Sequence, residues 1–295
     1  METTYPPLKI LDGGLATELE SRGHDLDDDL WSAKLLRDQP DEIVAAHQAF
    51  INAGAEVITS GSYQATLPGF RKAGMTSTEA ENLLRLSIRL AKQARGQAPS
   101  VQVAASIGPY GAFLANGAEY TGKYDLDQQG LMEFHDQRWQ ILASENPDIM
   151  LCETVPSLTE ATALAQLAVN SNAIPVWISF SCRDGNHISD GTEIRSVIRE
   201  LRPYEQITAV GINCSPPKFL PELIPRIRLE TDKPIVVYPN SGESFDANSR
   251  TWSGSQAIDD FATQAAVWRQ LGASIIGGCC RVTPAHIASL KSRLQ

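Results

Sequence analysis

The sequence of 295 residues lacks the features that mark nucleic-acid-binding, membrane and secreted proteins. It has no block of Lys and Arg, and 25 basic against 35 acidic residues give a formal net charge of −10. This charge argues against nucleic acid and anionic membrane as partners. No apolar run approaches the ~18 residues of a membrane-spanning helix, and the first residues show no basic and apolar signal segment. We therefore expect no membrane partner and a cytoplasmic location.

The motifs of several common enzyme classes are also missing. The sequence has no GxSxG, GxxxxGKS/T, GxGxxG or HExxH pattern. These absences remove the usual signs of serine hydrolases, P-loop proteins, dinucleotide-binding proteins and histidine-ligated zinc proteases. The five cysteines, an odd number spread through the chain, do not make a disulfide framework and fit a reducing compartment.

A regular alternation of short apolar runs and amphipathic segments is present instead. The runs are 8–11, 56–59, 101–105, 149–151, 175–180, 207–212, 235–238 and 274–276. The amphipathic segments are 41–53, 77–95, 126–145, 157–170, 192–201, 218–229, 255–271 and 283–294. Eight strands alternating with eight helices predict an α/β fold, a (β/α)8 TIM barrel, with a doubly wound parallel sheet as the alternative. Because no linker divides the chain, we expect one barrel domain over residues 1–295.

Polar and reactive residues stand at the carboxyl ends of the expected strands, where a barrel carries its chemistry. They are Asp12, Gly13, Gly14, Ser60, Gly61, Ser62, Tyr63, Ser106, Cys152, Glu153, Thr154, Ser179, Ser181, Asn213, Cys214, Tyr238, Pro239, Asn240, Gly277, Gly278, Cys279 and Cys280. Three long connections follow strands, at 61–76, 108–125 and 239–254, and loops of this length are functional more often than structural. We expect them to wall a pocket.

Three cysteines are expected to meet at this face. Cys279 and Cys280 follow a pair of glycines, where two adjacent thiols could form a vicinal disulfide, pack in the core or bind one soft metal ion. Cys214 follows the sixth strand, and strands six and eight both lie close to strand seven. Three converging thiolates predict an open zinc site with a vacant fourth position. Cys152 and Cys182 are interpreted as small core residues.

Several segments together resemble the homocysteine S-methyltransferase family. They are LDGGLATEL at 11–19, SYQAT at 62–66, CET at 152–154, GINC at 211–214 and GGCCR at 277–281. The combination of Asn-Cys with Gly-Gly-Cys-Cys is specific, and the matches run from the first strand to the last helix. The segment VYPNSGE at 237–243, with Trp252 after it, resembles stand-alone members that use S-methylmethionine or S-adenosylmethionine. The C-terminal extension of betaine-using relatives is absent, so we expect a monomer.

The resemblance implies that Zn²⁺ is held by Cys214, Cys279 and Cys280, which are then catalytic residues. A thiol with a pKa of about 8.5 is mostly protonated at neutral pH and is a poor nucleophile. Zinc would bind homocysteine as its thiolate, which would attack the methyl group of a sulfonium donor to make methionine. The expected partners are thus two small molecules, homocysteine and the sulfonium.

Other substrate contacts are expected from the strand ends. Glu153 is predicted to be a catalytic residue that binds the homocysteine ammonium, with a salt bridge inside the barrel as the alternative. Asp12 is predicted to bind the substrate ammonium, with bracing of a loop as the alternative. The amides of Gly13 and Gly14 could receive the substrate carboxylate, because glycine permits close approach of the backbone. Ser62 is included as a substrate-binding residue of the same face.

Aromatic and amide side chains supply the remaining candidates. Tyr63 is the preferred contact of the sulfonium, because aromatic faces attract cations. Tyr238, Trp31 and Trp252 are further candidates for the same contact. Asn240 is predicted to fill the fourth position of the zinc when substrate is absent.

Other functions remain open at this level. The same site could serve betaine or another thiol or selenol in methyl transfer. A zinc-activated water would make it a hydrolase, although such sites favour His and carboxylate ligands. A zinc store without catalysis is the third alternative. The choice between S-methylmethionine and S-adenosylmethionine depends on the shape of the pocket.

Overall fold

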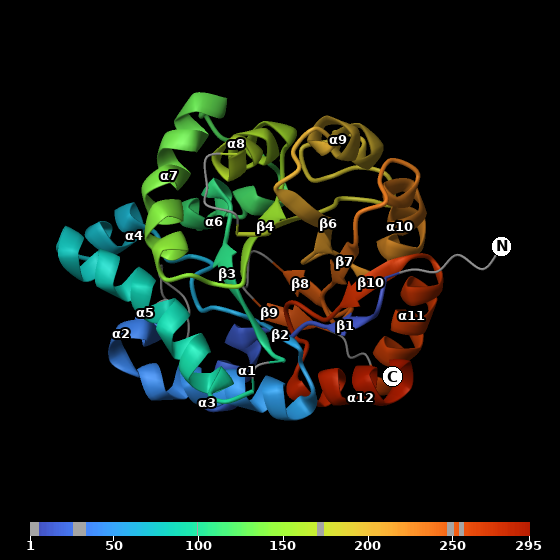
Figure 1. The fold of residues 1–295 in the computed structure, drawn as a ribbon, viewed down its shortest axis with the longest axis horizontal. Coiled ribbons are helices and arrows are strands. Elements are labelled where there is room, and N and C mark those ends of the chain that lie inside the picture. The colour runs from blue at the N-terminus through green and yellow to red at the C-terminus, as the bar shows by residue number, and fades with distance from the viewer. Residues whose placement is uncertain (1–5, 26–33, 99, 170–173, 247–250, 254–256) are drawn as a thin grey trace.

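The computed structural model describes residues 6–25, 34–98, 100–169, 174–246, 251–253 and 257–295. Eight parallel strands form one sheet in the order β1-β10-β7-β6-β5-β4-β3-β2 (Figure 1). In chain order they are β1 (Lys9–Ile10), β2 (Val57–Thr59), β3 (Gln102–Ile107), β4 (Ile149–Val155), β5 (Val176–Phe180), β6 (Ile207–Asn213), β7 (Ile235–Tyr238) and β10 (Ala273–Ile276). Each of the eight predicted runs contains or overlaps one of these strands.

The first and last strands of that order meet, which closes the sheet. A parallel bridge pairs Leu11 with Val57. The amide of Glu56 donates to the carbonyl of Ile10 at 2.7 Å, and that of Asp12 to the carbonyl of Val57 at 3.0 Å. The predicted single-domain (β/α)8 barrel is therefore confirmed, and the doubly wound alternative is wrong.

Helices surround the sheet, one after each strand (Figure 1). The outer layer consists of α3 (Pro40–Ala53), α5 (Ser77–Arg95), α7 (Gln128–Ser144), α8 (Leu158–Val169), α9 (Ile194–Leu201), α10 (Leu220–Arg228), α11 (Ile258–Gln270) and α12 (Pro284–Leu294). All eight correspond to predicted amphipathic segments. No helix in the described parts of the chain is long and apolar enough to cross a membrane.

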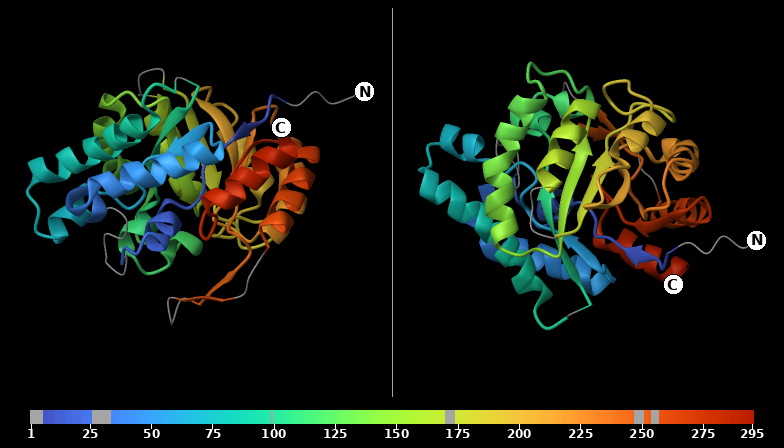
Figure 2. Two further views of the ribbon diagram at one scale, coloured as in Figure 1. Left: turned by 90° about the horizontal axis from the view of Figure 1, so that it is seen from below. Right: turned by 45° about the horizontal axis from the view of Figure 1, so that its top comes forward.

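Additional short elements lie in the connections that follow the strands. They are α1 (Leu15–Ser21), α2 (Leu35–Asp38), α4 (Leu67–Lys72), α6 (Tyr110–Leu114), η2 (Ala118–Tyr120), η3 (Pro217–Phe219), β8 (Ser244–Asp246) and β9 (Thr251–Ser253). The antiparallel pair β8 and β9 stands out from the barrel on the side where α1 lies (Figure 2). The three connections predicted to be long thus carry structure of their own.

Two apolar clusters fill the molecule, because each strand is buried on both faces. The larger cluster lies between sheet and helices. The smaller fills the barrel interior and consists of Leu11, Val57, Ala104, Ile149, Leu151, Trp177, Ala209, Val236, Tyr238 and Ile275. Such a packed interior leaves the carboxyl ends of the strands as the place for a site.

Candidate active site

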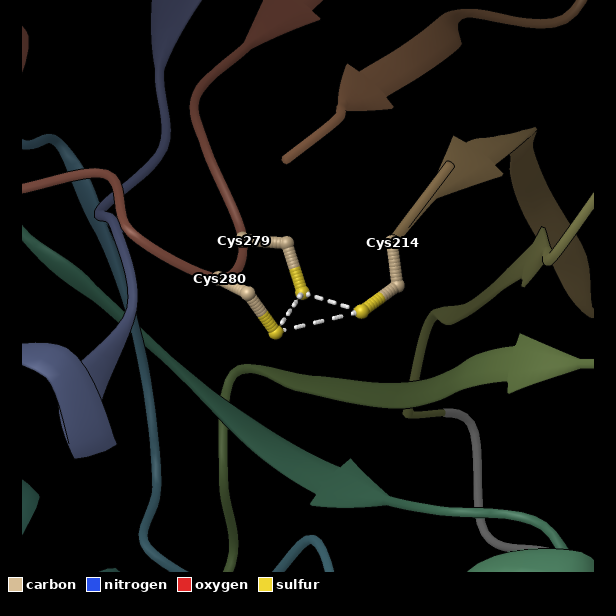
Figure 3. Close-up of side chains that lie close together, drawn as sticks. All are labelled: Cys214, Cys279 and Cys280. Carbon is tan, nitrogen blue, oxygen red and sulfur yellow. Dashed lines mark hydrogen bonds between the residues drawn. The ribbon is translucent and has the colours of Figure 1, made fainter. Parts of the chain in front are cut away.

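The sulfur atoms of Cys214, Cys279 and Cys280 form a triangle at the barrel mouth (Figure 3). Its sides are 2.9 Å from Cys214 to Cys279, 3.5 Å from Cys214 to Cys280 and 4.0 Å between the adjacent pair. Three sulfurs bound at ~2.3 Å around a tetrahedral zinc would lie roughly 3.8 Å apart. All three are free thiols, so the donor set and its spacing fit a soft metal ion.

Hydrogen bonds between neighbouring strand ends bring the sulfurs together. The amide of Cys214 donates to the carbonyl of Tyr238 at 3.2 Å, and that of Cys279 to the carbonyl of Pro239 at 2.8 Å. The ends of β6 and β10 are therefore both tied to the end of β7, which lies between them. Hydrogen bonds with Cys279 and Cys280 lower the pKa of Cys214.

The glycine pair before the cysteines is required by close packing. A Cβ atom on Gly277 would lie 2.6 Å from the carbonyl oxygen of Asp12, and one on Gly278 would lie 2.2 Å from Cγ1 of Val282. The amide of Gly278 also donates to the carbonyl of Asp12 at 2.9 Å. Any larger side chain would push the cysteine loop away from β1.

Asn213 organises the same face, although the sequence suggested no role for it. Its Oδ1 accepts hydrogen bonds from the Thr154 amide at 2.7 Å and the Ser179 hydroxyl at 2.9 Å, and its Nδ2 donates to the Thr154 hydroxyl at 2.8 Å. The side chain is fully buried. It therefore joins the ends of β4, β5 and β6 next to Cys214.

Glu153 lies in this face with one side chain oxygen bonded to the Ser106 hydroxyl. Burial raises its pKa to about 7, and repulsion by the charge of Cys214 acts in the same direction. Hydrogen bonds from Ser106 and Tyr238 lower the pKa but do not offset burial. No described Lys, Arg or His lies within ion-pair distance of the carboxylate. The predicted alternative, a salt bridge inside the barrel, is therefore not found among the described residues.

Asp12 and Ser62 are held by protein groups. A carboxylate oxygen of Asp12 accepts the Thr59 amide at 2.7 Å, and burial raises the pKa of Asp12 well above its usual range. The Ser62 hydroxyl donates to the Ser106 carbonyl at 2.7 Å and bonds with the Ser60 hydroxyl at 2.7 Å. Both side chains thus contact neighbouring strand ends, and the binding of substrate by Asp12 and Ser62 stays a prediction.

Gly13 and Gly14 pack against the cysteine loop. A Cβ atom on Gly14 would lie 2.6 Å from the carbonyl of Cys279, and one on Gly13 would lie 2.5 Å from the carbonyl of Val282. The amide of Gly14 donates to this Val282 carbonyl at 2.9 Å. The expectation that the Gly14 amide receives a carboxylate is therefore wrong for this arrangement, because that amide is already bonded.

The predicted aromatic contacts differ in their surroundings. Tyr63 bonds through its side chain to Thr154, and burial with the nearby charges of Glu119 and Cys214 raises its pKa. The Tyr238 hydroxyl bonds to Ser179, and the ring belongs to the barrel interior. Trp31 lies outside the described residues, and Trp252 is described only as part of strand β9.

Asn240 lies beside the cysteine pair with an unsatisfied acceptor. The amide of Ser241, the next residue, donates to the Cys280 carbonyl at 3.0 Å. The side chain Oδ1 of Asn240 is buried and has no hydrogen-bond partner among the described residues. Because a buried polar atom is rarely left unbonded, this oxygen is suited to an additional ligand such as a metal ion.

Two further residues of the site come from η2, which periodicity did not reveal. The hydroxyl of Tyr120 lies 3.3 Å from the sulfur of Cys214. Its neighbour Glu119 has a pKa raised to about 7 by burial, with an added contribution from Cys214. Cys152 and Cys182, by contrast, are buried in the outer apolar cluster, which confirms their interpretation as core residues.

Comparison with known proteins identifies the family. The family model described as homocysteine S-methyltransferase matches residues 9–294, nearly the whole chain. The chain belongs to the homocysteine S-methyltransferase family. This confirms the resemblance seen in the sequence.

Relatives from bacteria and plants match nearly the whole chain. The homocysteine S-methyltransferase YbgG of Bacillus subtilis is 43% identical, with 97% of this chain and 94% of that protein covered. A selenocysteine Se-methyltransferase of Brassica oleracea is 42% identical, over 97% of this chain and 88% of that protein. The metallated form of the homocysteine methyltransferase MmuM from Escherichia coli has a TM-score of 0.88 at 39% identity, covering 98% and 96%.

Membership of the homocysteine S-methyltransferase family makes this chain an enzyme that transfers methyl groups, as predicted. The three-cysteine group is a site able to hold a metal in such an enzyme. The hydrolase and the zinc store find no support in these relatives.

Proposed function

We propose that the protein is a zinc-dependent homocysteine S-methyltransferase that takes the methyl group of a sulfonium, S-methylmethionine or S-adenosylmethionine, to make methionine. The observation that carries this proposal is the triangle of three free thiols with sides of 2.9 to 4.0 Å. Three thiolates leave a fourth position of a tetrahedral metal for a thiol substrate. The names of the homocysteine S-methyltransferase relatives support the acceptor.

Cys214, Cys279 and Cys280 would hold the zinc. When bound, the ion supplies an ionised substrate thiol at neutral pH, at which a free thiol is mostly protonated. The unbonded Oδ1 of Asn240 is proposed as the fourth ligand in the absence of substrate. The existence of a metallated form of MmuM supports a metal in a protein of the same fold.

Homocysteine would be oriented by the neighbouring strand ends. Glu153 is proposed to bind the ammonium, because it is buried and lacks a described cationic partner. The Gly13 amide remains as the candidate for the carboxylate, since that of Gly14 is bonded. Asp12 and Ser62 would act by holding these strand ends in register.

The methyl transfer itself requires no proton movement at the protein. The homocysteine sulfur forms a bond to the methyl carbon as the bond from that carbon to the sulfonium sulfur breaks. The electron pair of the broken bond stays with the leaving sulfur, which becomes a neutral thioether. Tyr63 is close enough to Cys214 for the charge of that sulfur to raise its pKa, and it is proposed to face the sulfonium, because aromatic rings attract cations.

A selenol acceptor is a second candidate, because the selenocysteine Se-methyltransferase is as similar as the homocysteine enzymes, at 42% against 43% identity. We further propose that residues 1–295 act as one barrel domain, as a monomer and in the cytoplasm.

A comparison of substrates tests this function. Zinc-replete protein is supplied with homocysteine or selenocysteine and with S-methylmethionine, S-adenosylmethionine or betaine, and the methylated product is quantified by mass spectrometry. We expect methionine from homocysteine with at least one sulfonium and none with betaine. Absence of transfer from both sulfonium donors to either acceptor would contradict the proposal.

A further inference from the structure

Glu119 carries a buried carboxylate oxygen that accepts no hydrogen bond from the described part of the chain. This oxygen, Oε2, has no hydrogen-bond partner among the described residues. No described Lys, Arg or His lies within ion-pair distance of the side chain. The main chain of Glu119 is fixed independently, since its carbonyl accepts the Ser181 hydroxyl at 2.8 Å. The carboxylate is therefore not needed to hold η2 in place.

Glu119 belongs to η2, the short turn that contacts the sulfur triangle. The next residue, Tyr120, reaches the sulfur of Cys214 at 3.3 Å. After burial, the charge of Glu119 is the next cause that raises the pKa of Tyr63, and the charge of Cys214 adds to the effect of burial on the pKa of Glu119. Glu119, Tyr63 and Cys214 thus lie within electrostatic range of one another.

A buried carboxylate oxygen without a partner is unfavourable, because it has lost hydration and gained no hydrogen bond in return. The burial that raises the pKa of Glu119 to about 7 expresses this cost. A cation that enters from solution would remove it. Homocysteine brings one ammonium, for which Glu153 is the candidate, whereas the methyl donor brings an additional positive charge on its sulfonium sulfur.

We infer that Glu119 is the anionic anchor of a subsite for the positively charged methyl donor and faces its sulfonium centre. This inference rests on the proposed function and adds a residue to it. The sulfonium must lie close to the acceptor sulfur at the triangle, and Glu119 is the carboxylate of η2, the turn that contacts the triangle.

The chemistry of the step predicts how Glu119 acts. The sulfonium loses its positive charge as the methyl group leaves, so attraction to Glu119 is strongest before the transition state. An interaction of this kind contributes to donor binding and not to the rate of the bound complex. Removal of the charge should therefore raise the KM of the donor and leave kcat unchanged or higher.

Binding to the zinc-loaded protein without homocysteine tests the inference directly, because no turnover occurs. Calorimetry compares S-methylmethionine with its neutral carbon isostere, 2-amino-5-methylhexanoate, which keeps the ammonium and the carboxylate. We expect the wild type to prefer the sulfonium by about 10-fold or more, and Glu119→Gln to lose this preference. Glu133→Gln, on the exposed side of α7, is the matched control and should retain it.

Kinetics and zinc content complete the test. In Glu119→Gln, zinc stoichiometry and the KM of homocysteine should stay within about twofold of the wild type, a range of less than 0.5 kcal/mol. A rise in homocysteine KM in place of donor KM would overturn the inference, as would an unchanged sulfonium preference. Glu119→Asp, which keeps the charge, should largely retain the preference; its complete loss there would also overturn the inference.

The proposed function and this subsite fail in different ways. If the wild type prefers the sulfonium over the isostere in a Glu119-dependent manner but transfers no methyl group, the function is wrong and the subsite stands. If methyl transfer occurs and Glu119→Gln leaves donor binding unchanged, the function stands and the subsite is wrong.

Discussion

The side chain of Asn213 holds Thr154 through two hydrogen bonds, accepting its amide at 2.7 Å and donating to its hydroxyl at 2.8 Å. Both Thr154, at φ 59°, and Cys214, at φ 47°, adopt left-handed backbone conformations that are unfavourable for residues other than glycine. Asn213 precedes Cys214, and Thr154 follows Glu153. One amide side chain therefore fixes the positions from which a metal ligand and the candidate ammonium ligand both project.

Replacement of Asn213 tests this arrangement. Asn213→Ala leaves the buried Thr154 amide unbonded, so the free energy of unfolding should fall by about 1–3 kcal/mol. Zinc affinity, measured by competition with a chromophoric chelator, should fall about tenfold because Cys214 loses its orientation. Ser179→Ala removes a single bond to the same Oδ1 and should have a smaller effect on zinc. Equal zinc affinities in Asn213→Ala and wild type would show that the hydrogen bonds of the Asn213 side chain do not position Cys214.

The hydroxyl of Tyr120 should strengthen metal binding through its contact with Cys214. Removal of groups that orient metal ligands typically costs 10–100-fold in affinity or activity, and for this partly exposed tyrosine we expect the lower end, about tenfold. Tyr120→Phe is compared with Tyr124→Phe, whose lost hydroxyl bonds to Glu160 instead. The same chelator competition should show weaker zinc binding in the first variant only. Weaker binding in both variants would argue for a general effect of the loop.

The three converging cysteines should be required for metal retention, and the buried ones outside the triangle should not. Cys214→Ala, Cys279→Ala and Cys280→Ala each leave two thiolates, and zinc per chain should fall from about one to below about 0.1 after dialysis, with loss of methyl transfer. Cys182→Ala, within the outer apolar cluster, should retain zinc and activity. Atomic absorption measures the metal. Full zinc in an active Cys214→Ala variant would rule out the proposed mechanism.

His47 on α3 should make stability depend on pH independently of the active site. It is fully buried, and neither ring nitrogen has a partner among the described residues. Burial lowers its pKa from 6.5 to about 4, so between these values the folded state binds fewer protons than the unfolded state. The free energy of unfolding therefore falls as the pH decreases from 6.5 to 4, by about 3 kcal/mol from this group.

Substitution of His47 separates its contribution to the free energy of unfolding from that of carboxylates, which titrate in the same pH range. His47→Leu should have a free energy of unfolding within about 1.5 kcal/mol of the wild type at pH 7. Between pH 7 and pH 4, the free energy of unfolding of the variant should rise by about 3 kcal/mol relative to that of the wild type. Urea unfolding at both pH values measures the change. Parallel pH profiles for the two proteins would mean that His47 does not titrate as its burial predicts.

Local patterns sufficed for the barrel but not for the elements in its loops. The run at 207–212 lies within β6, and the segment at 77–95 has the bounds of α5. Such elements can be predicted because the hydrophobic period and the apolar residues that become buried are visible in each segment. The helices α4 and α6 and the turn η2 are only three to six residues long, too short for a hydrophobic period to appear. Glu119 and Tyr120 were missed for this reason.

Roles that depend on partners were also beyond a local pattern. The glycine pair at 13–14 is typical of an anion-binding site, but the Gly14 amide donates to the carbonyl of Val282, which lies far along the chain. Asp12 is braced by Thr59 from the neighbouring strand. The lack of a hydrogen-bond partner for Oδ1 of Asn240 among the described residues is likewise visible only in the tertiary structure.

The sequence by itself determined the strands, the outer helices and the donor chemistry, since hydrophobic period and residue type are local properties of a chain. It also placed Cys214, Cys279 and Cys280 at strand ends. Only the tertiary structure decided that their sulfurs lie within 4.0 Å of one another and that η2 contacts them through the hydroxyl of Tyr120. Closure of the barrel sets these distances, because each depends on hydrogen bonds between strands that are remote in sequence.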